Sequence, residues 1–178
     1  MESSWRIILL IFLLGGSGFF SASETALTSL NRVRVRNMVE DNVKGAKTLE
    51  NLINNPSRLL GTILVGNNVV NIGASSLATS IAIDLFGNTG VGIATGVMTL
   101  LVLVFGEITP KSLAAENSEK IALKVSGPIS NLGKILSPIV RILLFITDGI
   151  SKLLGAKSNE NTPFITKSEL RTMLNVSH

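Results

Sequence analysis

Three asparagines interrupt an apolar run in the stretch VGNNVVNIG, residues 65–73. Asn67 and Asn71 are four residues apart and therefore share one face of a helix, whereas Asn68 is rotated by about 100° from Asn67. An amide that is buried without a hydrogen-bond partner costs roughly 1–3 kcal/mol. Asn67 and Asn71 are therefore expected to find polar partners on their shared face, and Asn68 is expected to serve another helix contact.

Further polar side chains lie within or beside two other apolar runs. The first run carries Ser17, Ser21, Ser23 and Glu24, and the third ends in GEITPK, which places Glu107 at its end. Amide, hydroxyl and carboxylate oxygens form the ligand set that hard divalent cations prefer. The three runs contain no histidine and no cysteine, which argues against zinc or copper.

Pro110 follows Glu107 closely and cannot continue a regular helical hydrogen-bond pattern. We expect it to break or kink the third run and to free a nearby backbone carbonyl, for example that of Gly106, as a further ligand. A second interpretation stays open from spacing alone. Asparagine and serine also form hydrogen bonds between membrane helices as packing contacts, and Gly92 and Gly96 form a GxxxG pair that brings helices close.

Three apolar runs must position these groups. They cover residues 7–23, 59–83 and 85–106, contain no charged residue, and occur in a chain with 16% charged residues and a mean hydropathy of +0.46. About 20 apolar residues cross a bilayer as a helix, and a β-barrel would need alternation instead of blocks. The pattern predicts an all-α membrane protein with three transmembrane helices. For the first run, which is short unless it continues through ALTSL, a cleaved signal peptide is the alternative.

The basic residues predict the orientation of these helices in the cell (inner) membrane. They gather between the first two runs and after the third: Arg32, Arg34, Arg36, Lys44, Lys47 and Arg58, then Lys111, Lys120, Lys124, Lys134 and Arg141. The connection between the second and third runs carries none. We therefore expect the first loop and the C-terminal region to be cytoplasmic, the N-terminus to be outside, and Trp5 to be an interfacial anchor.

The remaining segments read as helices at the inner membrane surface. The first loop has helical character, with Gly45 as a break and Pro56 as a helix start. Residues 121–154 are apolar but carry spaced lysines, which favours amphipathic helices lying along the membrane, kinked or interrupted at Pro128 and Pro138. A fourth crossing is the alternative, although the uncharged part is short.

A change of composition near Gly155 predicts two regions. Residues 1–155 form the transmembrane domain with its helical belt, and residues 156–178 form a linker, AKSNENTP, and the start of a cytosolic unit opened by the capping box TKSE. No nucleophile–base pair and no phosphate-cradling loop is visible, so we do not expect an enzyme.

The segments FFSASETALTSLNRVRVRNM, NNPSRLLGTILVGNNVVNIGASSLAT and FGEITPKSLA together resemble the transmembrane domain of the CNNM/CorC magnesium transporter family. The resemblance covers roughly residues 5–155, and PFITKSELRTML looks like the approach to that family's cystathionine-β-synthase (CBS) domain pair. It implies a homodimer in the lipid bilayer with three transmembrane helices and a juxtamembrane belt. It also implies Mg²⁺ bound in an inward-facing cavity, with export coupled to Na⁺ entry.

The resemblance also implies a ligand set. Matched residue by residue, it assigns Ser21, Asn67, Asn71 and Glu107 to the ion, with Ser23, Asn68 and the Gly106 carbonyl as further candidates. Nucleotide binding in that family belongs to the CBS domains, so no ATP site is expected within the chain, and no nucleic-acid partner. Two other functions stay open: a magnesium sensor that regulates another transporter, and a membrane anchor for cytosolic CBS domains.

Overall fold

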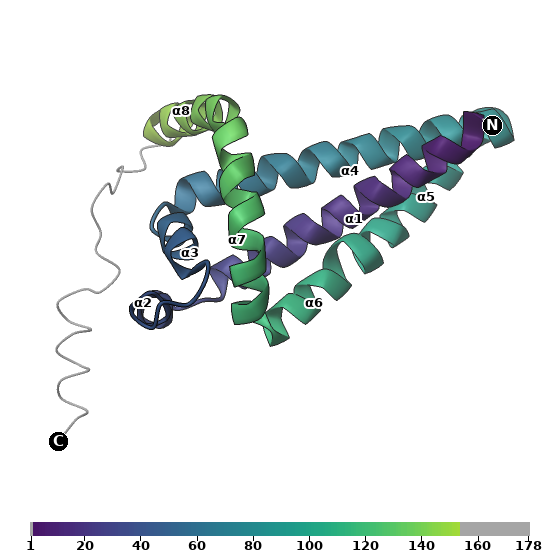
Figure 1. Ribbon diagram of the computed structural model, residues 1–178. Coiled ribbons are helices and arrows are strands. Elements are labelled where there is room, and N and C mark those ends of the chain that lie inside the picture. The colour runs from purple at the N-terminus through teal and green to yellow at the C-terminus, as the bar shows by residue number, and fades with distance from the viewer. Residues whose placement is uncertain (1, 154–178) are drawn as a thin grey trace, which may run out of the picture. The chain divides into compact units, whose positions relative to one another are not determined.

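The computed structural model describes residues 2–153, and every regular element in this range is helical (Figure 1). The chain divides into two units at Arg141/Ile142, and the first contains the candidate site. Its elements are, in order, α1 (Glu2–Thr28), α2 (Arg32–Glu40), α3 (Ala46–Ile53), α4 (Pro56–Phe86), the 3₁₀ turn η1 (Gly87–Thr89), α5 (Gly90–Leu101), the π-helix η2 (Val102–Ile108), α6 (Thr109–Glu116) and α7 (Ser118–Ile135). Helix α8 (Ser137–Leu153) crosses the division between the two units.

Two helical runs are long and apolar enough to cross a membrane, Ser4–Thr28 and Pro56–Glu116. The second run has 61 residues and reverses its direction at η1, so its two arms lie antiparallel (Figure 1). Gly87 makes this reversal possible because it adopts a φ of 64°, which side chains disfavour. At Gly90 a Cβ would overlap the carbonyl of Ala82 in the opposite arm.

The predicted all-α membrane fold is therefore confirmed, with α1, α4 and the α5–η2 arm as its three spanning segments. The boundary between the second and third segments was wrong by a few residues. Leu85 and Phe86 end α4 and do not begin the third segment. The sequence carries no break between apolar blocks at this point, and the reversal depends on the glycine two residues later than Leu85.

Helix α1 lies between the two arms of the hairpin. On one side, Gly16 lies against Val70 and Phe20 lies over Gly66, so α1 and α4 approach closely. On the other side, Gly18 lies against the backbone carbonyl of Phe105 in η2. Small residues at these positions allow helices in a membrane to pack with their backbones near each other.

The end of the bundle opposite η1 is built from α2, α3 and α7, as the helical character of the first loop predicted. The side chain of Asn31 caps α2 by accepting from the Val33 amide, and Gly45, with a φ of 89°, separates α2 from α3. Leu27, Val35, Leu49 and Ile129 belong to one buried core that joins these helices to α1. Helix α7 crosses α1 and α4 at this end (Figure 1).

The two prolines predicted to interrupt the fourth apolar segment differ in their effect. Helix α7 continues through Pro128, whereas Pro138 lies at the start of α8 after a break at Leu136. A proline in the first turn of a helix lacks only an amide that would have no helical partner. Neither α7 nor α8 is long and apolar enough by itself to cross a membrane. The two helices reach that length only when they are taken together as one bent pair. Whether they lie along the membrane stays a prediction.

Residues 154–178 lie outside the described part of the chain. This range includes the predicted linker and the predicted TKSE capping box, so the division into residues 1–155 and 156–178 stays a prediction. Within the second unit, the described residues 142–153 form the C-terminal part of α8. Its large apolar side chains, such as Phe145 and Leu153, are exposed.

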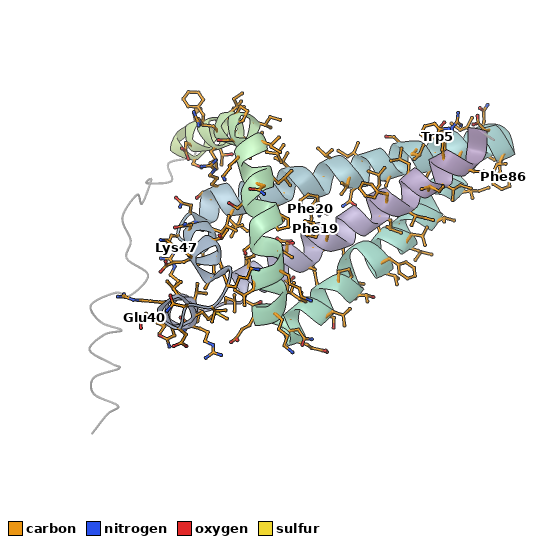
Figure 2. All side chains as sticks on the ribbon, viewed as in Figure 1. Trp5, Phe19, Phe20, Glu40, Lys47 and Phe86 are labelled. Carbon is orange, nitrogen blue, oxygen red and sulfur yellow. The ribbon has the colours of Figure 1, made fainter. Side chains whose placement is uncertain are left out.

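The two ends of the helical hairpin differ in chemistry. Trp5 and Phe86 lie together at the end where η1 reverses the chain, and Glu40 and Lys47 lie at the opposite end (Figure 2). At the first end, Arg6 Nη1 forms an ion pair of 2.6 Å with Asp84 Oδ2, which ties the start of α1 to the end of α4. Tryptophan is enriched at both membrane–water interfaces, so Trp5 at this end agrees with the predicted interfacial anchor.

Candidate functional site

Three serines of α1 are completely buried: Ser17, Ser21 and Ser23. Ser17 and Ser21 are one helical turn apart and share a face, so both can present oxygen to the same neighbours. The Ser17 hydroxyl lies 3.5 Å from the carbonyl oxygen of Gly106 and donates to it. The Ser21 Oγ forms no hydrogen bond in the described part of the chain.

The two asparagines predicted to share a face of α4 contact each other directly. Asn71 Nδ2 donates to Asn67 Oδ1 over 3.4 Å, as the four-residue spacing requires. The Asn71 Oδ1 atom is buried and accepts no hydrogen bond within residues 2–153. This contact turns the amide nitrogen of Asn71 toward Asn67 and leaves its carbonyl oxygen available to a donor or a cation.

The third element of the site is the π-helix η2, which carries Gly106 and Glu107. Pro110 lacks an amide hydrogen, so it cannot donate to the Gly106 carbonyl four residues earlier. The predicted break does not occur, because the wider π-helix absorbs the mismatch and the helical run continues through Pro110 into α6. Single π-helical turns of this kind are frequent at functional sites.

Glu107 is half-buried in η2. Its carboxylate forms no hydrogen bond and no ion pair among the described residues. By contrast, Glu24 near the C-terminal end of α1 lies 3.6 Å from Lys111 Nζ, which already neutralises its charge. Of the two carboxylates near the ends of the spanning segments on this side, only Glu107 is therefore free to neutralise a cation.

Close contacts between the helices bring these groups to one level of the bundle. Asn67 and Asn71 directly follow Gly66 and Val70, which lie against Phe20 and Gly16 of α1. Glu107 directly follows Gly106, which lies against Ser17. The oxygens of three spanning segments thus lie within about one and a half helical turns of α1.

Not every predicted ligand belongs to this group. Asn68 is exposed on another face of α4, as its rotation from Asn67 predicted. The Ser23 hydroxyl donates to the Phe19 carbonyl of its own helix over 2.7 Å. The groove lined by Asn71 is lined by neither Ser21 nor Glu107, so the described chain does not by itself close a single cage around the four main candidates.

Ser17 is the residue that the candidate set omitted. Its position four residues before Ser21 was the signal available in the sequence, since both serines then share a helix face. The arrangement as a whole offers neutral hydroxyl, amide and carbonyl oxygens with one carboxylate. No cluster of three histidine, cysteine, aspartate or glutamate side chains occurs in the described residues. Such a donor set suits a hard cation that retains part of its water.

Comparison with known protein families gives a match over nearly the whole chain. The family profile described as "Cyclin M transmembrane N-terminal domain" (CNNM) matches residues 8–178.

Curated relatives from bacteria and plants agree with this match. The chain is 42% identical over 171 residues to a "UPF0053 protein" of Haemophilus influenzae, covering 96% of the chain and 41% of the relative. It is 41% identical to the "UPF0053 inner membrane protein YfjD" of Escherichia coli (strain K12), covering 90% of the chain and 38% of the relative. A chloroplastic DUF21 domain-containing protein of Arabidopsis thaliana is 41% identical, over 94% of the chain and 25% of its own length. The chain thus spans about two fifths or less of these relatives.

Proposed function

Because the chain belongs to the CNNM transmembrane-domain family, we propose that it binds Mg²⁺ between its transmembrane helices and transports the ion across the cell membrane. One observation carries this proposal. Two oxygen atoms on neighbouring helices, Ser21 Oγ and Asn71 Oδ1, are buried without a partner, and an unpaired carboxylate, Glu107, lies at the same level. A cation bound at this level is the partner that we propose for these groups.

Each proposed ligand has a distinct part in holding the ion. Glu107 supplies the only negative charge, so the occupied site carries a net charge of +1, which limits affinity and eases release. Ser21, Asn67 and Asn71 supply neutral oxygens, and the carbonyl of Gly106 lies beside them through its contact with Ser17. Mg²⁺ prefers oxygen ligands at about 2.0–2.1 Å in an octahedron and gives up its water reluctantly. We therefore expect water to complete its shell.

Ser23 and Asn68 are left out of the proposed ligand set. Unlike Ser21 Oγ, the Ser23 hydroxyl already has a hydrogen-bond partner in its own helix, so its burial does not call for an ion, and Asn68 is exposed. Asn68 suits a contact with another helix, which agrees with the proposed homodimer. Cytosolic CBS domains are a further proposed partner, since the curated relatives are more than twice as long as the segment they share with the chain.

The proposed direction of transport is export, with the ion entering from the cytoplasmic end and Na⁺ entry supplying the driving force. The distribution of lysine and arginine supports this orientation, because the basic helices α2 and α7 lie at one end of the bundle. Glu107 lies at the level of the asparagines, and its charge attracts a cytoplasmic cation to the site.

Calorimetric titration of the purified protein with MgCl₂ tests the site. We expect Glu107→Ala to abolish binding and Glu107→Gln to weaken it by about 10–100-fold, because an amide keeps the shape but loses the charge. Asn71→Ala should weaken binding severely. Glu116→Gln is the matched control, since Glu116 is an exposed carboxylate outside the site. If Glu107→Ala binds Mg²⁺ with unchanged affinity, Glu107 is not a ligand and the proposed site is wrong.

Flux measurements separate transport from the other functions of a magnesium-binding membrane domain. In liposomes that contain only the purified protein, a transporter releases trapped Mg²⁺ when an inward Na⁺ gradient is applied, and Glu107→Gln does not. Binding without flux would identify a magnesium sensor, and an absence of both would identify a passive anchor.

A further inference from the structure

A groove between α4 and α5 has no role in the proposed Mg²⁺ site, although it includes one of the proposed ligands, Asn71. It has a volume of about 340 Å³. Its polar lining consists of Asn71, Ser75 and Thr79 from α4 and Thr95 and Thr99 from α5. Apolar side chains such as Met98 and Val102 complete its walls.

The polar residues lie on one side of the hairpin because of their spacing along the two helices. Asn71, Ser75 and Thr79 repeat every four residues on α4, and Thr95 and Thr99 do so on α5. A second groove on the same hairpin, which includes Leu10 of α1, is lined almost entirely by apolar residues such as Ala78 and Leu101.

The protons of the threonine hydroxyls are already used. Thr79 donates to the Ser75 carbonyl, Thr95 to the Val91 carbonyl and Thr99 to the Thr95 carbonyl, each over 2.8 Å. What these hydroxyls retain are lone pairs, which accept hydrogen bonds or coordinate cations. Asn71, which also lines the groove, carries a buried acceptor without a donor, its Oδ1 atom. The groove therefore matches an occupant that brings positive charge or hydrogen-bond donors.

We propose that this groove is the outer half of the ion pathway, a vestibule that holds a partly hydrated metal cation between Asn71 and the outer turn η1. This inference rests on the proposed function and on the predicted orientation. Asn71 is common to the ligand set and the groove, so an ion that leaves Glu107 and Ser21 stays in contact with protein oxygen. Thr95 is six residues beyond Thr89, or about 9 Å of helix, and thus close to the outer end.

The absence of charge from the lining determines how the vestibule works. None of the nine residues that line it is acidic, basic or histidine. Neutral oxygens exchange readily with water, so the cation regains its hydration shell without being trapped. The threonine hydroxyls already donate to their own helices, and in hydrocarbon their remaining lone pairs would meet neither a donor nor a cation. Water and the cation are the occupants that engage these lone pairs.

Cysteine accessibility tests the proposal, because the 178 residues contain no cysteine. Ser75→Cys and Thr95→Cys place a thiol in the groove. Ile72→Cys and Leu100→Cys are matched controls on the same helices, where the native side chains are exposed apolar groups outside both grooves. A charged, membrane-impermeant methanethiosulfonate is added from the outer side of intact cells that express the chain.

We expect both groove thiols to react at least tenfold faster than the controls. Addition of Mg²⁺ or of Na⁺, each against choline, identifies the cation, because the occupying ion slows the reaction at position 75. Equal rates at all four positions, or reaction from the cytoplasmic side only, would overturn the proposal. Protection of both thiols from either side would also overturn it and would indicate that another polypeptide surface covers the groove.

The two proposals fail in different ways. If Mg²⁺ does not bind the purified protein but the groove thiols react from outside and Na⁺ slows them, the magnesium site is wrong and the vestibule stands. If Mg²⁺ binds through Glu107 but the groove thiols are unreactive, the vestibule is wrong and the magnesium site stands.

Discussion

Two buried oxygen atoms at the candidate site lack a hydrogen-bond partner in the described residues, Ser21 Oγ and Asn71 Oδ1. An unsatisfied buried acceptor or donor costs about 1–3 kcal/mol, so a protein that only needed packing would favour alanine or leucine there. Other buried hydroxyls in the same bundle are satisfied: those of Ser23 and Thr62 donate to carbonyls of their own helices. The contrast distinguishes packing hydroxyls from the one proposed to bind an ion.

Ser21→Ala separates these two roles at a single residue. Without Mg²⁺ we expect the thermal midpoint to stay the same or to rise, because an unsatisfied hydroxyl has been removed. Mg²⁺ affinity should fall about tenfold, which calorimetric titration measures. Ser23→Ala is the control: it changes stability by about 1 kcal/mol or less and leaves Mg²⁺ affinity unchanged. Equal losses of affinity in both variants would contradict the assignment.

Gly66 sets the distance between α1 and α4, since a Cβ there would overlap the ring of Phe20. We expect Gly66→Ala to lower the stability of the bundle by about 1–3 kcal/mol, as overpacking does. At Gly73, on the same helix, a Cβ would lie 3.6 Å from Leu13, an ordinary contact. Gly73→Ala should therefore be tolerated. Thermal unfolding in one detergent compares the two, and equal midpoints would contradict the packing described.

At the scale of elements, much of the fold could be predicted from the sequence. The three apolar blocks identified the spanning helices because their length and lack of charge leave few alternatives. Gly45 and Pro56 predicted helix limits because their backbones restrict what can continue there. The π-helix could not be predicted. The missing amide of Pro110 requires an adjustment, but the packing of Gly18 and Ser17 against η2 determines which one occurs.

For the candidate site, spacing placed Asn67 and Asn71 on one face and turned Asn68 away, and the structure has the same arrangement. The spacing could not predict that the hydroxyl of Ser23 donates a hydrogen bond to its own helix, because any serine in a helix can do so. The spacing also could not predict which residues of η2 lie beside which residues of α1. That alignment depends on contacts between residues such as Ser17 and Gly106, which are 89 positions apart.

The ion pair between α2 and α7 predicts a dependence of stability on pH. Arg34 donates to Glu119 through two nitrogens, over 2.7 and 3.1 Å, and this contact lowers the pKa of the Glu119 carboxyl below its usual value. The stabilisation is therefore complete above the ordinary carboxylate pKa of about 4.3 and is lost as the pH falls through the lowered pKa of the folded state.

Thermal unfolding of the wild type and Glu119→Gln over a range of pH tests this prediction. We expect a small difference in midpoint at pH 7 that shrinks toward zero in acid, because protonation of Glu119 removes the same charge as the substitution. The effect is small because both side chains are largely exposed. If the difference in midpoint between the wild type and Glu119→Gln grows as the pH falls, the prediction is wrong.

For the whole molecule, the predicted orientation places η1 outside and the α2–α3 end in the cytoplasm. Asn88→Cys in the exposed outer turn and Lys44→Cys between α2 and α3 each provide one reactive thiol. We expect an impermeant maleimide to label position 88 in intact cells and position 44 only after the membrane is opened. The reverse pattern would invert the orientation and with it the proposed direction of export.

The three-residue turn η1 also determines which parts can move independently. Because this connection is so short, α4 and α5 cannot move apart at this end, and a tilt of one helix requires a tilt of the other. Helix α1 joins this pair through the longer α2–α3 segment, and along the bundle it meets its neighbours at glycines such as Gly16 and Gly18. The hairpin is therefore expected to move as one body, and any displacement of α1 along it has to break the Arg6–Asp84 ion pair.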